Sequence, residues 1–377
     1  MSILSRCQGD QSDGETSMKK NGRRFLQRRF ITINGCIVGT SVLLFGAVFG
    51  PTHVSIAQQR NIGQRQAFLQ AEGERDVTIT AIPGVIAAGT KWKIAWQGAD
   101  NADGLVGTPD GGLLFAQEQP SIIGKLDKDD HYSVFIKDTH GAGAVTIDKQ
   151  GRIIAAQRTC TDPGRPTNLG PCTEPPMVSV LAPERKVLAD KFEGKPIERL
   201  NDVVVDGKGN VYFSAGTAYY IKSSGGEVRK VGDNIRSNGI IVSPDDKTLY
   251  VTNNTVIMAF DIQPDGTVNN RREFVKLERG NGDGMAVDAA GRVYISTGAS
   301  GIQIFAPDGK YLGTIPLPRD VASIAFSGPE KKTLYAQGRG ALGPDGKEFK
   351  TPEGVRNNAK TIYKIPMLAQ GFKNRAK

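Results

Sequence analysis

Histidine and aromatic side chains are scarce in this chain. Its 377 residues include three histidines, His53, His131 and His140, and aromatic residues make up 7% of the sequence. No HExxH pair is present, which argues against a zinc site built from histidines and favours oxygen donors for any metal. The sequence also lacks the GxSxG motif of serine hydrolases and the GxxxxGK[ST] loop that binds phosphates.

A basic surface for nucleic acid is not apparent, although the net charge is +9. Residues 1–57 carry seven Lys or Arg against three acidic residues, so four of these charges lie in the N-terminal segment. The remaining charge is spread over 320 residues without a basic stripe or interleaved aromatic residues. Because nucleic-acid binding depends on clustered Lys and Arg, we expect no nucleic-acid partner.

The N-terminal segment has the layout of an export leader. A cationic stretch from Met18 to Phe30 precedes Ile31–Phe49, 19 residues without a charge, and small residues stand before Gln58. The Arg23-Arg24 pair resembles a twin-arginine signal. We therefore expect residues 1–57 to be a signal peptide, with translation starting at Met18, and the mature protein to be periplasmic or secreted. An uncleaved membrane anchor is the alternative, because 19 uncharged residues nearly span a bilayer.

Cysteine usage agrees with export. Two of the four cysteines lie in the leader, and Cys160 and Cys172 lie in a loop rich in proline and glycine. In an exported protein such a pair is expected to form a disulfide, with two free thiols as the alternative.

The chain after the leader repeats one pattern six times. Each unit is a short apolar run, a turn of Asp, Gly, Pro or Lys, and a second apolar run, which is typical of a β-hairpin. The units are residues 103–116, 143–156, 201–214, 238–252, 283–296 and 323–336. Their starts are 40, 58, 37, 45 and 40 residues apart, and such a period predicts propeller blades.

We therefore predict an all-β fold, a six-bladed β-propeller with a central channel over residues 76–377, preceded by an N-terminal arm over residues 58–75. Segments 76–83 and 361–365 are expected to be strands of the last blade, which closes the ring. We expect a monomer with no stable membrane association after the leader is removed.

The first residue of each unit is a candidate ligand, because equivalent positions of the inner strands converge on the axis. The six are Asp103, Gly143, Asn201, Asn238, Asp283 and Ser323. Two carboxylates and two amides form a hard-cation site, suited to Ca²⁺, with Mn²⁺, Mg²⁺ or Zn²⁺ as alternatives. The other interpretation is that these residues only form turns, as we expect for the aspartates in the hairpin turns: Asp110, Asp148, Asp206, Asp245 and Asp288.

Four stretches of the sequence resemble the SMP-30/gluconolactonase family. They are residues 198–206, 237–252, 282–294 and 325–335. The family consists of six-bladed propellers with one divalent cation, and its members include hydrolases of sugar lactones. The resemblance implies that Asn238 and Asp283 bind the metal and that Asp283 is also the candidate general base. It also implies that Asn201 contacts the substrate or a metal-bound water, with Arg199 beside it on the substrate side.

The first blade departs from the family pattern. Its ligand is usually Glu, and here the matching residue is Asp103, one methylene shorter. With Asp103, Asn238 and Asp283 as metal ligands, we predict a metal-dependent hydrolase that opens a sugar lactone or related cyclic ester. The alternative is a non-catalytic propeller that binds a glycan, a peptide or a protein partner and holds a structural cation.

Overall fold

The computed structural model describes residues 73–159, 174–223, 225–352 and 357–374. The predicted leader, most of the predicted arm, and Cys160 and Cys172 lie outside these residues. The described part consists of strands and turns, with one short 3₁₀ helix, η3 (Pro329–Lys331). None of its helices is long and apolar enough to cross a membrane.

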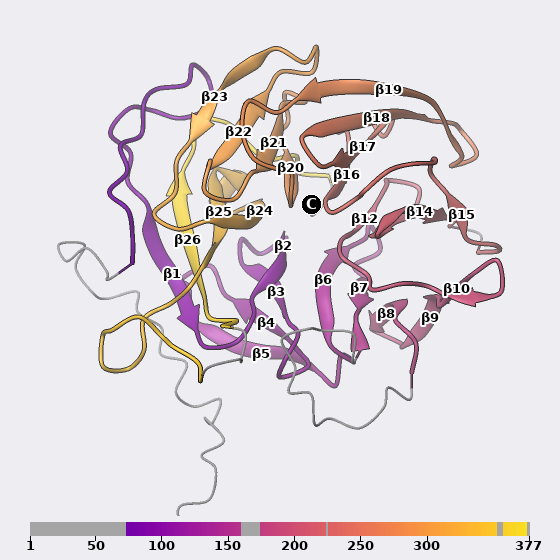
Figure 1. Ribbon diagram of the computed structural model, residues 1–377, viewed down its shortest axis with the longest axis horizontal. Helices are drawn as coiled ribbons and strands as arrows, with labels where there is room; N and C mark the ends of the chain where they lie inside the picture. The colour runs from indigo at the N-terminus through magenta and orange to yellow at the C-terminus, as the bar shows by residue number, and fades with distance from the viewer. Residues whose placement is uncertain (1–72, 160–173, 224, 353–356, 375–377) are drawn as a thin grey trace, which may run out of the picture. The chain divides into compact units, whose positions relative to one another are not determined.

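Six four-stranded antiparallel sheets, the blades, surround a common centre (Figure 1). The first is β2 (Asp103–Gly107), β3 (Leu113–Gln117), β4 (Ile122–Leu126) and β5 (Tyr132–Lys137). The second is β6 (Ala142–Ile147), β7 (Ile153–Gln157), β8 (Met177–Ala182) and β9 (Lys186–Ala189). The third is β12 (Val203–Val205), β13 (Val211–Ala215), β14 (Thr217–Ile221) and β15 (Arg229–Lys230).

The fourth blade is β16 (Ile240–Val242), β17 (Thr248–Asn253), β18 (Val256–Ile262) and β19 (Val268–Lys276). The fifth is β20 (Met285–Val287), β21 (Val293–Ser296), β22 (Ile302–Phe305) and β23 (Tyr311–Ile315). The sixth is β24 (Val321–Ser327), β25 (Thr333–Arg339), β26 (Lys360–Pro366) and β1 (Lys93–Gly98). A small hairpin, β10 (Lys191–Phe192) with β11 (Lys195–Pro196), follows the second blade.

The innermost strands hold the ring together. They are short apolar runs such as Val203–Val205 and Ile240–Val242, and all of these residues are buried. Each inner strand contacts the next in the order β2, β6, β12, β16, β20, β24 and back to β2. Every predicted hairpin unit supplies the first two strands of one blade, so the predicted six-bladed propeller is confirmed.

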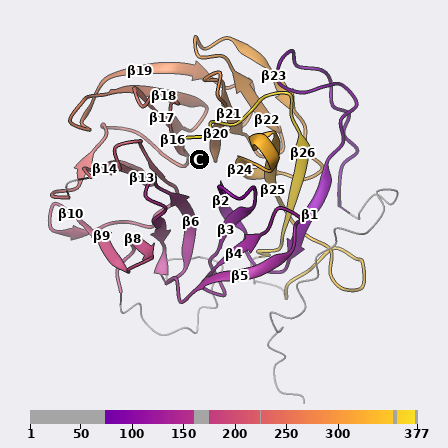
Figure 2. The ribbon, with the colours of Figure 1, turned by 180° about the vertical axis from the view of Figure 1, so that it is seen from behind.

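The strand that closes the ring differs from the predicted one. Segment 361–365 lies in β26 as predicted, but its outer partner is β1, and both views show these two strands side by side (Figures 1 and 2). Residues 76–83 form no strand. Instead, Ile82 and Ile86 bridge a tight turn that contains Pro83 and Gly84, with Gly84 at φ 69°. Proline lacks the backbone N–H that a ladder needs, and the isoleucines of this turn are buried against the last two blades.

Candidate functional site

The ends of several inner strands line one small polar cavity. Its volume is about 150 Å³. The residues at or just before inner strands that line it are Asp103, Asn201, Asn238, Asp283 and Ala322. Other loops and strands add Asn101, Glu118, Arg158, Arg199, Gln337, Arg339, Asn358 and Lys360. The residues predicted as metal ligands and substrate contacts therefore all lie in the walls of the same cavity.

Backbone hydrogen bonds fix two of these residues, Asn201 and Asp283, at the start of their blades. The N–H groups of Asn201 and Asp283 donate to the carbonyls of Ser214 and Ser296, at 2.8 and 2.9 Å. Each acceptor belongs to, or ends, the second strand of the same blade. The repeated hairpin thus sets the position of the first residue, which explains why the register of the repeats predicts which side chains come together.

Two of the six candidate positions, Gly143 and Ser323, do not line the cavity. The hydroxyl of Ser323 instead accepts a hydrogen bond from the N–H of Leu105 at 3.0 Å, which ties the sixth blade to the first. At Gly143 a Cβ atom would lie 2.0 Å from Nε of Arg158. Glycine at this position therefore makes room for an arginine side chain that crosses the second blade.

Asp103 and Asp283 are close enough to perturb each other electrostatically. Burial and the nearby Asp103 carboxylate raise the pKa of Asp283 to about 7, against the opposing effect of the Arg339 guanidinium. Arg339 Nη2 lies 3.5 Å from Asp283 Oδ2, too far for a strong hydrogen bond. Among the described residues, the side-chain amide of Asn238 has no hydrogen-bond partner. Two mutually repelling carboxylates and an uncommitted amide are a donor set that fits a hard divalent cation.

A buried ion pair that the repeat pattern did not reveal borders this donor set. Arg158 and Glu118 are 3% and 1% exposed, and Arg158 Nη1 donates to Glu118 Oε2 at 2.8 Å. Arg158 also donates to the carbonyl of Leu200 at 2.8 Å and to Oδ1 of Asn201 at 3.1 Å. Its Nη2 lies 3.7 Å from Asp103 Oδ2. Arg158 therefore fixes the amide of Asn201 and lies beside the Asp103 carboxylate.

Arg199 lies on the other side of the same glutamate. Its Nη2 is 3.4 Å from both carboxylate oxygens of Glu118, and its side chain is 32% exposed. The predicted position of Arg199 at the site is thus observed. Gln337 also lines the cavity, and within the described part of the chain neither polar atom of its buried amide has a hydrogen-bond partner.

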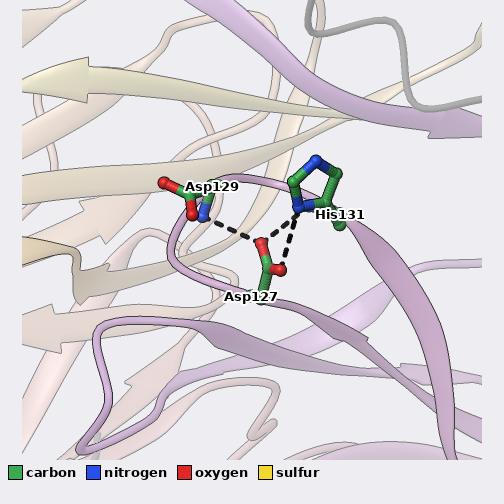
Figure 3. Close-up of side chains that lie close together, drawn as sticks. All are labelled: Asp127, Asp129 and His131. Atoms are coloured by element: carbon green, nitrogen blue, oxygen red, sulfur yellow. Dashed lines mark hydrogen bonds and ion pairs between the residues drawn. The ribbon is translucent and has the colours of Figure 1, made fainter.

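A second cluster of possible ligand atoms lies on an exposed hairpin, away from the cavity. Asp127, Asp129 and His131 place one ligand atom each within 4.8 Å of one another between β4 and β5 (Figure 3). The Asp127 carboxylate accepts the N–H groups of Asp129 and His131 at 2.8 and 2.9 Å and contacts the His131 ring at 3.0 Å. These hydrogen bonds explain why the three side chains lie close together: they stabilise the turn between β4 and β5.

A family model confirms the resemblance seen in the sequence. The model described as SMP-30/Gluconolactonase/LRE-like region matches residues 95–337, more than half of the chain. The chain belongs to this family. The matched span of the SMP-30/gluconolactonase family contains all six hairpin units and ends before Arg339, Asn358 and Lys360, the last residues of the cavity wall.

Curated relatives are lactone hydrolases by name. A gluconolactonase from Zymomonas mobilis is 25% identical over 267 residues, 59% of this chain and 71% of that protein. A lactonohydrolase from Aspergillus oryzae is 23% identical over 202 residues, 42% of this chain and 46% of that protein.

Solved structures of SMP-30/gluconolactonase-like proteins share the fold. A gluconolactonase from Xanthomonas campestris superposes with a TM-score of 0.61 at 20% identity, covering 81% of this chain and 99% of that one. A calcium-binding protein, regucalcin, from Agrobacterium tumefaciens has a TM-score of 0.57 at 16% identity, covering 75% and 95%. At these identities the likeness supports the architecture alone.

Proposed function

We propose that this protein is a metal-dependent hydrolase that opens a sugar lactone or a related cyclic ester. The observation that carries the proposal is the set of oxygen donors, Asp103, Asn238 and Asp283, in the wall of one small polar cavity. The gluconolactonase relatives support the reaction class, because they share the family with this chain.

The divalent cation would be held by Asp103, Asn238 and Asp283. Ca²⁺ is favoured because the donor set consists of carboxylates and amides without a histidine or a thiolate, and a structural neighbour is described as calcium-binding. Mn²⁺, Mg²⁺ and Zn²⁺ are the alternatives. When bound, the cation would polarise the lactone carbonyl and offset the negative charge that develops on its oxygen.

Asp283 is the proton acceptor in this proposal. Of the three cavity carboxylates, Glu118 is engaged by two arginines, and Asp103 accepts the N–H of Gly104 at 2.9 Å. The contact of Asp283 with Arg339 is longer, at 3.5 Å. Asp283 would take a proton from the attacking water as the oxygen–carbonyl bond forms. The ring carbon–oxygen bond would then break, and the departing ring oxygen would receive a proton.

Arg199 and Asn201 would orient the substrate beside this carboxylate. Asn201 is fixed by the hydrogen bond from Arg158, so its remaining amide N–H groups point in a defined direction. Arg199 is partly exposed and could donate to hydroxyl or carbonyl oxygens of the lactone. Positioning of this kind lowers the barrier by converting part of the reaction into an intramolecular step.

Acid release measured by pH-stat titration tests the proposal. The full-length protein would be given a panel of sugar and aliphatic lactones with Ca²⁺, Mn²⁺, Mg²⁺, Zn²⁺ or chelator. We expect metal-dependent hydrolysis, and Asp283→Asn should lower kcat by about 10²–10⁴-fold because it removes the proton acceptor. The control is Asp308→Asn, which changes an exposed aspartate in the β22–β23 turn and should retain full activity.

Two results would contradict the proposal. An Asp283→Asn variant with unchanged kcat would remove Asp283 from the reaction. A protein that binds one cation yet opens none of the lactones would favour the non-catalytic binding propeller instead.

A further inference from the structure

The amide of Gln337 is buried in the wall of the cavity without a partner for its hydrogen bonds. Gln337 lies in β25, and its side chain is fully buried. Among the residues that the structure describes, none is hydrogen-bonded to its Nε2 or Oε1. An unpaired buried donor and acceptor cost folding free energy, because both are hydrogen-bonded to water in the unfolded chain. Such a side chain in a cavity wall is suited to a ligand that supplies the missing partners.

The equivalent position in three other blades serves the scaffold of the ring. It lies near the end of the second strand and holds Ser214, Thr252 and Ser296 in the third, fourth and fifth blades. Each of these hydroxyls donates to a backbone carbonyl in or just before an inner strand. In the sixth blade, Ser323 is the register partner of Gln337, and its hydroxyl makes the link to the first blade. The Gln337 amide is therefore not needed for that link.

The strand register places Gln337 near the proposed proton acceptor. Gln337 and Arg339 are two residues apart in β25, so their side chains lie on the same face of the strand. On that face, Arg339 Nη2 lies 3.5 Å from Oδ2 of Asp283. On the adjacent inner strand, the carbonyl of Ala322 accepts the N–H of Gly284, which follows Asp283, at 2.8 Å. A ligand at Asp283 would therefore share a cavity of about 150 Å³ with Gln337.

We propose that Gln337 is a specificity-determining residue that binds hydroxyl groups of the lactone. The inference rests on the proposed function and specifies which lactones the site selects. An amide offers both a donor and an acceptor, and hydroxyl groups match both, whereas a carboxylate only accepts and a metal ion uses only the oxygen. A lactone without hydroxyl groups would leave the buried amide unpaired, so the site should discriminate against it.

Two lactones with the same five-membered ring test this selection. D-glucono-1,4-lactone carries hydroxyl groups, and γ-butyrolactone has none. We expect the full-length protein, assayed with added metal ion, to have the higher kcat/KM for the gluconolactone. Gln337→Met keeps the length of the side chain but removes the amide. This variant should lower kcat/KM for the gluconolactone by about 10–100-fold and leave the value for γ-butyrolactone within about two-fold of wild type.

Gln303→Met is the matched control, because Gln303 is also buried but its amide is engaged by the protein. In β22, outside the cavity wall, Gln303 accepts the N–H of Glu278 at 2.8 Å. It donates to the carbonyl of Arg279 at 2.6 Å and to Thr297 Oγ1 at 3.2 Å. This variant should lower the melting temperature by about 2–6 °C and keep the wild-type ratio of the two kcat/KM values. Gln337→Met should keep or raise the melting temperature, because it removes an unpaired buried amide.

Calorimetric binding of D-gluconate, the open-chain product, separates the inference from the proposed function. If Gln337→Met lowers kcat/KM for both lactones equally, or for neither, Gln337 does not select hydroxyl groups. The inference is then overturned and the hydrolase remains. If neither lactone is opened but D-gluconate binds about ten-fold more weakly to Gln337→Met than to wild type, the hydroxyl site is supported and the hydrolase is refuted. No turnover, with D-gluconate binding that is independent of Gln337, would overturn both.

Discussion

At the scale of single residues, the Asp103 and Asp283 carboxylates are close enough to repel each other. Both carboxylates are half-buried in the wall of a cavity of about 150 Å³, and burial together with repulsion from the Asp103 carboxylate raises the pKa of Asp283. The guanidinium groups beside them are 3.7 and 3.5 Å away, so neither makes a short charged hydrogen bond. A divalent cation between the two carboxylates would relieve the repulsion, and its binding should therefore stabilise the folded protein.

Thermal unfolding with and without cation measures this stabilisation. Ca²⁺ at about 100 times its dissociation constant should raise the free energy of unfolding by about 2.7 kcal/mol, since the ion binds the folded state. Asn238→Ala should weaken the effect, because it removes a ligand. Asn269→Ala, a change of an exposed asparagine on β19, should leave it intact. An identical melting temperature in cation and in chelator, for each of the four metals, would contradict a cation site.

The position of Asp103, Asn201, Asn238 and Asp283 was predictable from the sequence because it depends on local register. Each stands at the start of a repeated hairpin, and the propeller brings equivalent positions to one place. Glu118 and Arg158 were missed because each directly follows the second strand of its blade and they share no residue type across the repeats. Their pairing depends on the space above Gly143, and the only sign of it in the sequence is a glycine where other repeats carry a polar residue.

At the scale of elements, several hairpins use an aspartate to close the turn between their first two strands. Asp288 Oδ1 accepts the N–H groups of Ala290 and Arg292 at 2.9 and 3.0 Å. Its Oδ2 accepts the Tyr294 hydroxyl at 2.8 Å. Asp206 makes the same arrangement in the third blade, with its backbone contacts at 2.9 Å. The structural role predicted for these aspartates is confirmed, and they belong to the scaffold of the site.

Replacing Asp288 tests how much one such turn contributes. Asp288→Ala leaves the buried Tyr294 hydroxyl and two turn N–H groups without their acceptor, so we expect the free energy of unfolding to fall by about 2–4 kcal/mol. Asp308→Ala in the exposed β22–β23 turn should cost about 0.5 kcal/mol or less. Denaturant titration of both variants gives the comparison. Equal losses would show that the buried tyrosine contact adds nothing to the turn.

At the scale of the whole propeller, the segment that closes the ring could not be predicted from the repeats alone. The hairpin units predicted the first two strands of every blade. The outer strands differ more from one blade to the next and show a weaker pattern of apolar residues. The sixth blade takes its outermost strand, β1, from the N-terminal side of the described chain. Segment 76–83 resembles a strand in composition, but the turn at Pro83 and its burial against neighbouring blades give it another position. Long-range pairing of this kind depends on tertiary packing more than on local propensity.

Trp96 in β1 links the closing blade to the next one. Its side chain is fully buried. The centre of its ring lies 5.0 Å from the ring centre of Phe115 in β3 and 6.0 Å from that of Tyr132 in β5. The same strand pairs with β26, where Gly98 is the partner of Lys360. Trp96 therefore connects the ends of the ring and supports β26, the strand that begins at Lys360 in the cavity wall.

Trp96→Ala should destabilise the sixth blade, which closes the ring, more than it destabilises the other blades. We expect the free energy of unfolding to fall by about 3–5 kcal/mol, because a large buried side chain is lost and a cavity remains. Phe135→Ala, which removes an aromatic side chain that is 46% exposed on β5, should cost much less. Amide hydrogen exchange would locate the effect, since the N–H groups of residues 360–364 should exchange faster than those of the inner strands β12 and β16. If exchange rises equally in all blades, closure is not a separate step, and β1 is held by the ring as a whole.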